Sequence, residues 1–155
     1  MNIKDIDRFF EMVANYRRKN PDNDLGNFVI GLQGEFVFKQ LLDTLKIDYT
    51  WTEKGVPQPF DFIVNGSKIE IKTVTYNMNY PKGGRQDLLV IKSKAKADFY
   101  ILIAESLKEG FYIAGYVSND ELLKSEVLKT SKGHSYRVVP ERLWGISSLL
   151  NKLGA

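Results

Sequence analysis

Apolar residues recur at helical spacing in the first third of the chain. Ile3, Ile6, Phe10 and Val13 lie three or four positions apart, which predicts an amphipathic helix over residues 3–19. A polar loop at residues 20–24 offers several N-cap side chains for a second helix. That helix is predicted over about residues 25–46, and its apolar stripe is formed by Phe28, Leu32, Phe36, Phe38, Leu42 and Leu45.

The rest of the chain consists mainly of apolar segments of strand length. Residues 99–104 are apolar throughout, as expected of a strand that is buried on both faces. A short helix is predicted at 119–123, and a C-terminal helix begins at Pro140, since proline suits a first helical turn. The other predicted strands are 48–52, a hairpin over 60–75, then 88–91, 111–117 and an edge strand at 136–139. This order predicts one α/β domain over residues 1–155.

The hairpin is the most sharply specified of these elements. Asn65-Gly66 stands between two runs rich in β-branched and aromatic residues, which predicts a type I′ turn of two residues. That turn pairs residue 64 with 67, 63 with 68, 62 with 69 and 61 with 70. Because side chains alternate along a strand, Phe62 and Ile69 share the core face. Asp61, Glu70 and Lys72 then share the opposite face.

The predicted pairing places two carboxylates directly opposite each other. The Cβ atoms of Asp61 and Glu70 would lie about 4.5–5.5 Å apart, where like charges destabilise a hairpin. A divalent cation bound by both would offset the repulsion, and hard oxygen ligands suit Mg²⁺ or Mn²⁺. Lys72 points to the same place and can hold a phosphate oxygen or a water. The alternative is a solvated strand face with alternating Glu and Lys.

The second predicted helix carries an acid within its apolar stripe. Helical geometry places Glu35 near the middle of that stripe, where a carboxylate is costly unless it is paired. Gly31 and Gly34 lie beside it, and each glycine inside a helix costs about 1 kcal/mol relative to alanine. They favour the close approach of another backbone or a ligand. The alternative is an ion pair between Glu35 and Lys39, one helical turn later.

Composition excludes several classes of site. The chain has no cysteine and one histidine, which excludes disulfides, thiolate metal sites and histidine-rich zinc sites. No apolar run approaches 18 residues, so no membrane span is predicted, and the first residues lack the apolar core of a signal peptide. These features together predict a cytoplasmic protein.

Positive charge gathers beside the two carboxylates. The net charge is only +3, but residues 66–97 hold seven Lys or Arg and two acids. The loop at 76–86 contains two tyrosines and two cations and no acid, a mixture that suits contact with bases and phosphates. We predict nucleic-acid contacts for Tyr76, Lys82, Arg85 and Lys92. The alternative is an ordinary solvated surface loop.

Residues 25–104 resemble the PD-(D/E)xK nuclease superfamily, which includes many restriction enzymes and Holliday-junction resolvases. Asp61 and Glu70-Ile71-Lys72 match its motif, and Glu35 matches an additional helix acid seen in many members. The Pro-Asp step common in the family is interrupted here by Phe60. The resemblance implies a restriction-endonuclease-like αβββαβ core, with a mixed central sheet flanked by helices.

The same resemblance implies an activity. Asp61, Glu70 and the carbonyl of Ile71 would hold Mg²⁺, with Mn²⁺ as a substitute, and Glu35 would complete the metal shell. Lys72 would orient or deprotonate the attacking water. The expected function is a metal-dependent endonuclease acting on double-stranded or branched DNA, as a homodimer. A non-catalytic nucleic-acid-binding or assembly module on the same fold, and a nuclease acting on RNA, remain as alternatives.

Overall fold

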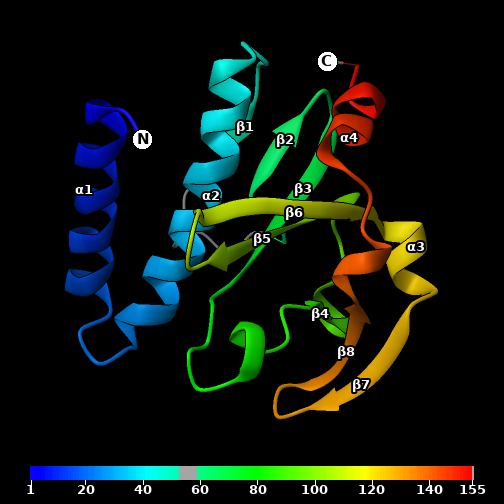
Figure 1. The fold of residues 1–155 in the computed structure, drawn as a ribbon. Helices are drawn as coiled ribbons and strands as arrows, with labels where there is room; N and C mark the ends of the chain where they lie inside the picture. Colours follow the sequence, from blue (N-terminus) through cyan, green and yellow to red (C-terminus); the bar gives the residue numbers. More distant parts are fainter. Residues whose placement is uncertain (53–58, 155) are drawn as a thin grey trace.

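The computed structural model describes residues 1–52 and 59–154 (Figure 1). Two helices open the chain, α1 (Ile3–Lys19) and α2 (Leu25–Thr44), close to the predicted bounds. Each begins at a side-chain cap: the side chain of Asn2 accepts from the N–H of Asp5, and that of Asp24 accepts from the N–H of Gly26. Local sequence therefore sets where both helices start.

A five-stranded mixed sheet forms the centre of the molecule. Its strands are β1 (Thr50–Trp51), β2 (Phe62–Val64), β3 (Ser67–Val74), β5 (Phe99–Ser106) and β6 (Gly110–Ser118), in the spatial order β1-β2-β3-β5-β6. Strands β3 and β5 are parallel, and the other neighbours are antiparallel. The prediction of an α/β protein with a mixed central sheet is confirmed at this level.

A second, smaller sheet packs across the first. It consists of β4 (Leu88–Ile91), β8 (Gly133–Val138) and β7 (Glu126–Thr130), with β8 in the middle. Sequence patterning did not predict β7, because most of its side chains are exposed and carry no apolar alternation. The remaining elements are the 3₁₀ turns η1 (Pro81–Gly83), η2 (Lys92–Lys94) and η3 (Pro140–Arg142), and the helices α3 (Asn119–Leu123) and α4 (Ile146–Lys152).

One predicted feature of the core is wrong. The αβββαβ pattern implied by the resemblance places a helix between the third and fourth strands of the central sheet. Residues 75–98 instead contain η1, β4 and η2 and no α-helix. The reason is that Leu88 and Val90 are buried while Leu89 is exposed, an alternation of period two that pairs β4 with β8.

The two faces of the central sheet are therefore covered differently. Helices α2 and α4 cover one face and bury Phe38, Leu42 and Leu149 against Ile69 and Ile101. The small sheet and α3 cover the opposite face. Their contact buries Leu88, Val90, Tyr136 and Leu122 against Tyr100 and Leu102.

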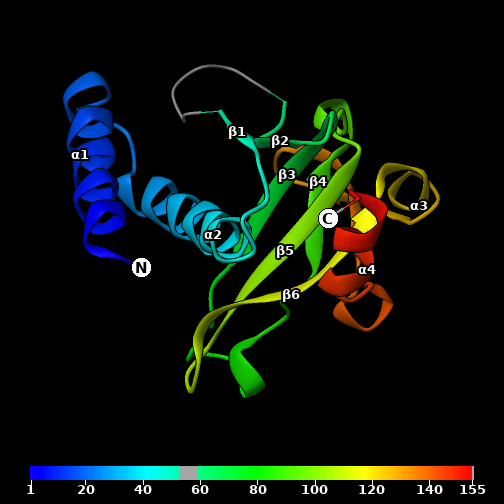
Figure 2. The ribbon, with the colours of Figure 1, turned by 90° about the horizontal axis from the view of Figure 1, so that it is seen from above.

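Helix α1 lies outside α2, away from the central sheet (Figures 1 and 2). A third apolar cluster joins the two helices, in which Tyr16 stacks on Phe28 with 3.9 Å between ring centroids. Within the two described ranges, no helix has both the length and the apolar character that a membrane crossing needs.

Candidate active site where β2 leaves β3

The hairpin forms with the predicted two-residue turn. Asn65 and Gly66 have φ values of 47° and 80°, the positive values that a type I′ turn requires. Val64 pairs with Ser67, Ile63 with Lys68 and Phe62 with Ile69. The register predicted for these three pairs is confirmed.

The pairing of β2 with β3 ends one residue before the predicted fourth pair. The N–H of Asp61 donates to the carbonyl of Ile69 at 2.8 Å, so the backbone of Asp61 is not in register with Glu70. The N–H of Ile71 donates to Oδ2 of Asp61 at 2.7 Å. The predicted direct opposition of residues 61 and 70 is therefore wrong: β2 diverges at Asp61, and the carboxylate of Asp61 bonds to the edge of β3.

Glu70 is a largely buried acid at this site. Its Oε1 accepts from Nζ of Lys72 at 2.8 Å, and its side chain is 15% exposed. Its second oxygen, Oε2, is buried and has no hydrogen-bond partner. Burial raises the pKa of Glu70, Asp61 raises it further, and the ammonium groups of Lys72 and Lys94 act in the opposite direction. A buried carboxylate oxygen without a partner suits a cation.

Lys94 belongs to this site, and sequence reasoning missed it. The basic run at 92–97 is visible in the sequence, but its position depends on η2 and on the parallel pairing of Glu70 with Tyr100. The structure brings Lys94 close enough to Glu70 to affect its pKa. The electrostatic cluster thus contains two acids and two lysines: Asp61, Glu70, Lys72 and Lys94.

Glu35 lies on the other face of the sheet. Its side chain is buried, and Oε1 accepts from Nε1 of Trp51 at 3.1 Å. Trp51 stacks on Phe62, whose side chain faces α2, whereas Glu70 and Lys72 face away from α2. Among the residues that the structure describes, no three His, Asp or Glu side chains form a group that could hold a metal. The structure therefore does not bring Glu35 to Asp61 and Glu70.

The glycine that precedes Glu35 has a packing role. A Cβ atom at Gly34 would lie 1.9 Å from Oγ1 of Thr73, so α2 and β3 can approach this closely only with glycine there. The close approach expected at Gly34 was that of another backbone or a ligand, and what lies there is the side chain of Thr73. Lys39, the alternative partner of Glu35, bonds to Asp5 at 2.9 Å and to Asp43 at 2.6 Å.

The predicted nucleic-acid residues separate into two places. Lys82 and Arg85 line a groove of about 920 Å³ between α2 and the loop that follows β3. Tyr76 supports this loop from within, because a Cβ atom at Gly83 would lie 2.2 Å from the Tyr76 ring. Lys92 lies elsewhere, with Nζ 5.8 Å from the centre of the Tyr136 ring.

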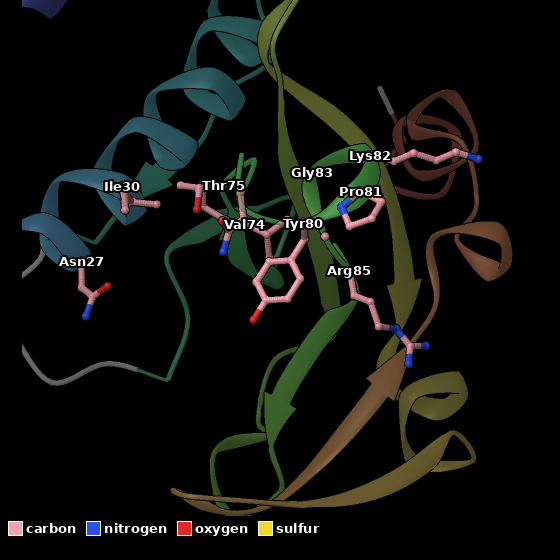
Figure 3. Close-up of a pocket in the computed structure, with 12 residues that line it drawn as sticks. Asn27, Ile30, Val74, Thr75, Tyr80, Pro81, Lys82, Gly83 and Arg85 are labelled. Atoms are coloured by element: carbon pink, nitrogen blue, oxygen red, sulfur yellow. The ribbon is translucent and has the colours of Figure 1, made fainter.

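The groove also contains residues that the sequence did not single out. Asn27 and Ile30 line it from α2, and Tyr80 lines it from the loop. Figure 3 shows the Tyr80 ring between these α2 side chains and Arg85, while the side chain of Lys82 extends away from the ring. The composition of the loop was a signal for Tyr80. Nothing in the helical pattern distinguished Asn27 and Ile30.

Compared with known proteins, the chain matches no protein-family model, and no curated protein matches its sequence.

Proposed function

We propose that this protein is a metal-dependent endonuclease that hydrolyses phosphodiester bonds in DNA. Its active site would be formed by Asp61, Glu70 and Lys72. The observation that carries the proposal is the buried Oε2 of Glu70, which has no hydrogen-bond partner, beside a second carboxylate and two lysines. Buried polar atoms are usually hydrogen-bonded, so a buried carboxylate oxygen without a partner is a candidate ligand for an ion.

The residues at the site fit a hard divalent cation such as Mg²⁺ or Mn²⁺. The carboxylates of Asp61 and Glu70 would hold it, with the carbonyl of Ile71 as a further oxygen ligand. The bound cation would activate a water and stabilise charge on the phosphate. The hydrogen bond from Ile71 orients the carboxylate of Asp61. The proposed ligand set leaves out Glu35, which lies on the other face of the sheet and bonds to Trp51.

The lysines supply positive charge where a phosphate would be attacked. The Lys72 side chain is 31% exposed, and its ammonium group bonds to Glu70. In that position it can hold a phosphate oxygen or orient the attacking water. Lys94 adds a second positive charge near the same carboxylate. Together they offset the repulsion between two acids and a phosphate.

The sheet topology also supports the proposal. Three antiparallel strands are followed by a parallel one, with the Asp at the start of the second strand and Glu-x-Lys in the third. These strands match the αβββαβ pattern that the PD-(D/E)xK resemblance implies, whereas the helix of that pattern before the fourth strand is absent from residues 75–98. We propose duplex or branched DNA as the substrate. A homodimer would allow both strands to be cut.

A second candidate is a non-catalytic nucleic-acid-binding module on this fold. It is favoured by the ion pair between Lys72 and Glu70 and by the absence, in the described part of the chain, of a group of three metal-ligating side chains. In this case Glu70 would serve only to hold Lys72.

Cleavage assays distinguish the two candidates. Purified protein is incubated with supercoiled plasmid, linear duplex and a four-way junction, in Mg²⁺, in Mn²⁺ and in EDTA. Glu70→Gln removes the charge with little change of shape. Glu141→Gln makes the same change at an exposed position in η3 and is the matched control.

The nuclease predicts metal-dependent cutting that is lost in Glu70→Gln and retained in Glu141→Gln. Cutting by Glu70→Gln at the wild-type rate would overturn the assignment. If the protein binds DNA but does not cut it in the presence of either Mg²⁺ or Mn²⁺, the result would support the non-catalytic nucleic-acid-binding module.

A further inference from the structure

The groove beside α2 is a second feature of the surface that the candidate active site does not explain. Its walls are α2, the end of β3 at Thr73–Thr75, and the loop from Asn77 to Arg85. At about 920 Å³ it lies at the upper end of the volumes of small-molecule pockets. It is therefore large enough for a nucleotide.

The chemistry of its walls suits nucleotides whose bases are unstacked. Tyr80 is 61% exposed and presents an aromatic ring, Asn27 offers an amide, and Arg85 offers a cation. No acidic residue lines the groove among the residues that the structure describes. Aromatic faces, amides and cations together bind single strands by stacking, base-edge hydrogen bonds and phosphate contacts. A stacked duplex offers Tyr80 no base face.

The loop that forms the outer wall is held in place before any ligand binds. Glu105 accepts from the N–H of Tyr76 at 2.9 Å through its side chain, and from Nε2 of Gln86 at 2.8 Å through its carbonyl. Across the loop, the N–H of Asn77 donates to the carbonyl of Gly83 at 2.8 Å. A preorganised wall lowers the ordering cost of binding.

The groove and the candidate active site share β3 but lie on its opposite faces, because Thr73 faces α2 whereas Glu70 and Lys72 face away from it. Thr73, which lines the groove, directly follows Lys72. The pairing of β3 with β2 stops at Ile69, whereas its pairing with β5 continues to Val74. Within the described ranges, the edge of β3 after Ile69 has no strand partner on the β2 side. To reach Glu70 from the groove, a polynucleotide strand would cross this edge of β3, beside the Asp61 carboxylate that bonds to the N–H of Ile71.

We propose that the groove binds unpaired nucleotides of the strand whose phosphate lies at Glu70 and Lys72. The substrate would then carry a single-stranded segment next to the cleaved bond, such as a tail, flap or open junction. The placement next to a cleaved bond rests on the nuclease proposed above. The binding of unpaired nucleotides in the groove does not depend on it.

Binding measured in EDTA tests the groove independently of cleavage. Fluorescence anisotropy gives Kd for a labelled single-stranded DNA, a blunt duplex of equal length, and that duplex with a single-stranded tail. Tyr80→Ala removes the ring and Tyr80→Phe keeps it. Phe10→Ala removes a similarly exposed ring, 65% exposed on α1, and is the control.

We expect the single strand and the tailed duplex to bind more tightly than the blunt duplex. Tyr80→Ala should weaken them by about fivefold or more, since stacking on one aromatic ring is worth at least about 1 kcal/mol per base. Tyr80→Phe and Phe10→Ala should bind as the wild type does. Blunt duplex bound equally well, or single-strand binding unaffected by Tyr80→Ala, would overturn the proposal.

The same oligonucleotide made as RNA identifies the sugar, and tighter binding of RNA would overturn the assignment to DNA. If the protein binds single strands through Tyr80 but cuts no DNA, the groove proposal is retained and the nuclease proposal is overturned. If the protein cuts blunt duplex and Tyr80→Ala does not change the binding of single strands, the nuclease proposal is retained and the groove proposal is overturned.

Discussion

The carboxylate of Asp61 accepts a hydrogen bond from the backbone N–H of Ile71, with 2.7 Å between Oδ2 and N. A side chain thus occupies the place that a backbone carbonyl of β2 would take if the strand continued. The bond fixes a carboxylate at the edge of β3 beside Glu70. It ties a candidate metal ligand directly to the stability of the sheet.

Asp61→Ala should therefore cost stability as well as any activity. It leaves the Ile71 N–H without this acceptor, which costs about 1–2 kcal/mol. Asp61→Asn keeps a side-chain oxygen and should lose less. Urea unfolding in EDTA measures both, with Asp22→Ala in an exposed loop as the control. Equal stability of Asp61→Ala and wild type would mean that water replaces the bond at no cost.

Glu70→Gln should be more stable than the wild type at pH 7 in EDTA. Burial raises the pKa of Glu70, so the ionised form is disfavoured in the folded state. Protonated Glu70 therefore contributes to the free energy of unfolding. This contribution is fully present below the ordinary glutamate pKa of about 4.3 and is lost as pH rises through the raised pKa. The advantage of Glu70→Gln should therefore disappear below about pH 4. Thermal unfolding from pH 3.5 to 8 measures it, and a variant less stable at pH 7 would contradict the prediction.

A divalent cation should make the wild type more stable than Glu70→Gln at pH 7. Mg²⁺ at ten times its Kd stabilises the wild type by about 1.4 kcal/mol, which is about 3–6 °C in Tm for a chain of this size. Glu70→Gln should show a much smaller shift, because one ligand has lost its charge. Titration of Mg²⁺ and Mn²⁺ into both proteins, followed by Tm, provides the measurement. Equal shifts in the two proteins would place the cation elsewhere.

Gly34→Ala should destabilise the contact between α2 and β3. Its Cβ atom would meet Oγ1 of Thr73 at 1.9 Å, and overpacking of this kind costs about 1–3 kcal/mol. Alanine recovers about 1 kcal/mol of helix propensity. A net loss should remain, and it should shrink in the double variant Gly34→Ala/Thr73→Ala. A stabilised single variant would show that Thr73 moves freely.

Lys39→Met should loosen the junction between α1 and α2. Lys39 bonds to the buried Asp5 of α1, and removing one partner of a buried pair costs about 3 kcal/mol. Lys4→Met, an exposed change on α1, should have little effect. Chemical denaturation compares them. If Lys39→Met and Lys4→Met lose equal stability, the pair contributes nothing.

The same junction predicts how stability responds to acid. Burial opposes the charge on Asp43, but hydrogen bonds from Lys39 and Tyr49 outweigh it and hold its pKa below the usual value. The ionised carboxylate of Asp43 thus contributes to the free energy of unfolding. This contribution is present above the ordinary aspartate pKa of about 3.9 and is lost as pH falls through the lowered pKa of Asp43. Asp43→Asn should show a shallower loss of stability below about pH 4, measured by unfolding across that range. An identical pH profile would contradict it.

The sequence by itself determined the features that depend on near neighbours. Asn65-Gly66 specified the turn and the pairing of β2 with β3, because positive φ values at two adjacent residues are a local requirement. The cap at Asn2 sets where α1 begins for the same reason. Of the apolar positions that predicted α1, Ile3, Ile6 and Phe10 are exposed. Glu70 and Lys72 could be placed on one face of β3 because side chains alternate along a strand.

Tertiary structure alone decided the rest. The divergence of β2 at Asp61, the burial of Glu70 and the approach of Lys94 depend on elements far apart in the chain. The pairing of β4 with β8 joins residues 88–91 to residues 135–138. This strand pairing occurs in the segment where the resemblance implied a helix. The groove needs α2 beside the loop after β3. Burial and pKa are properties of packed surroundings, which no local pattern contains.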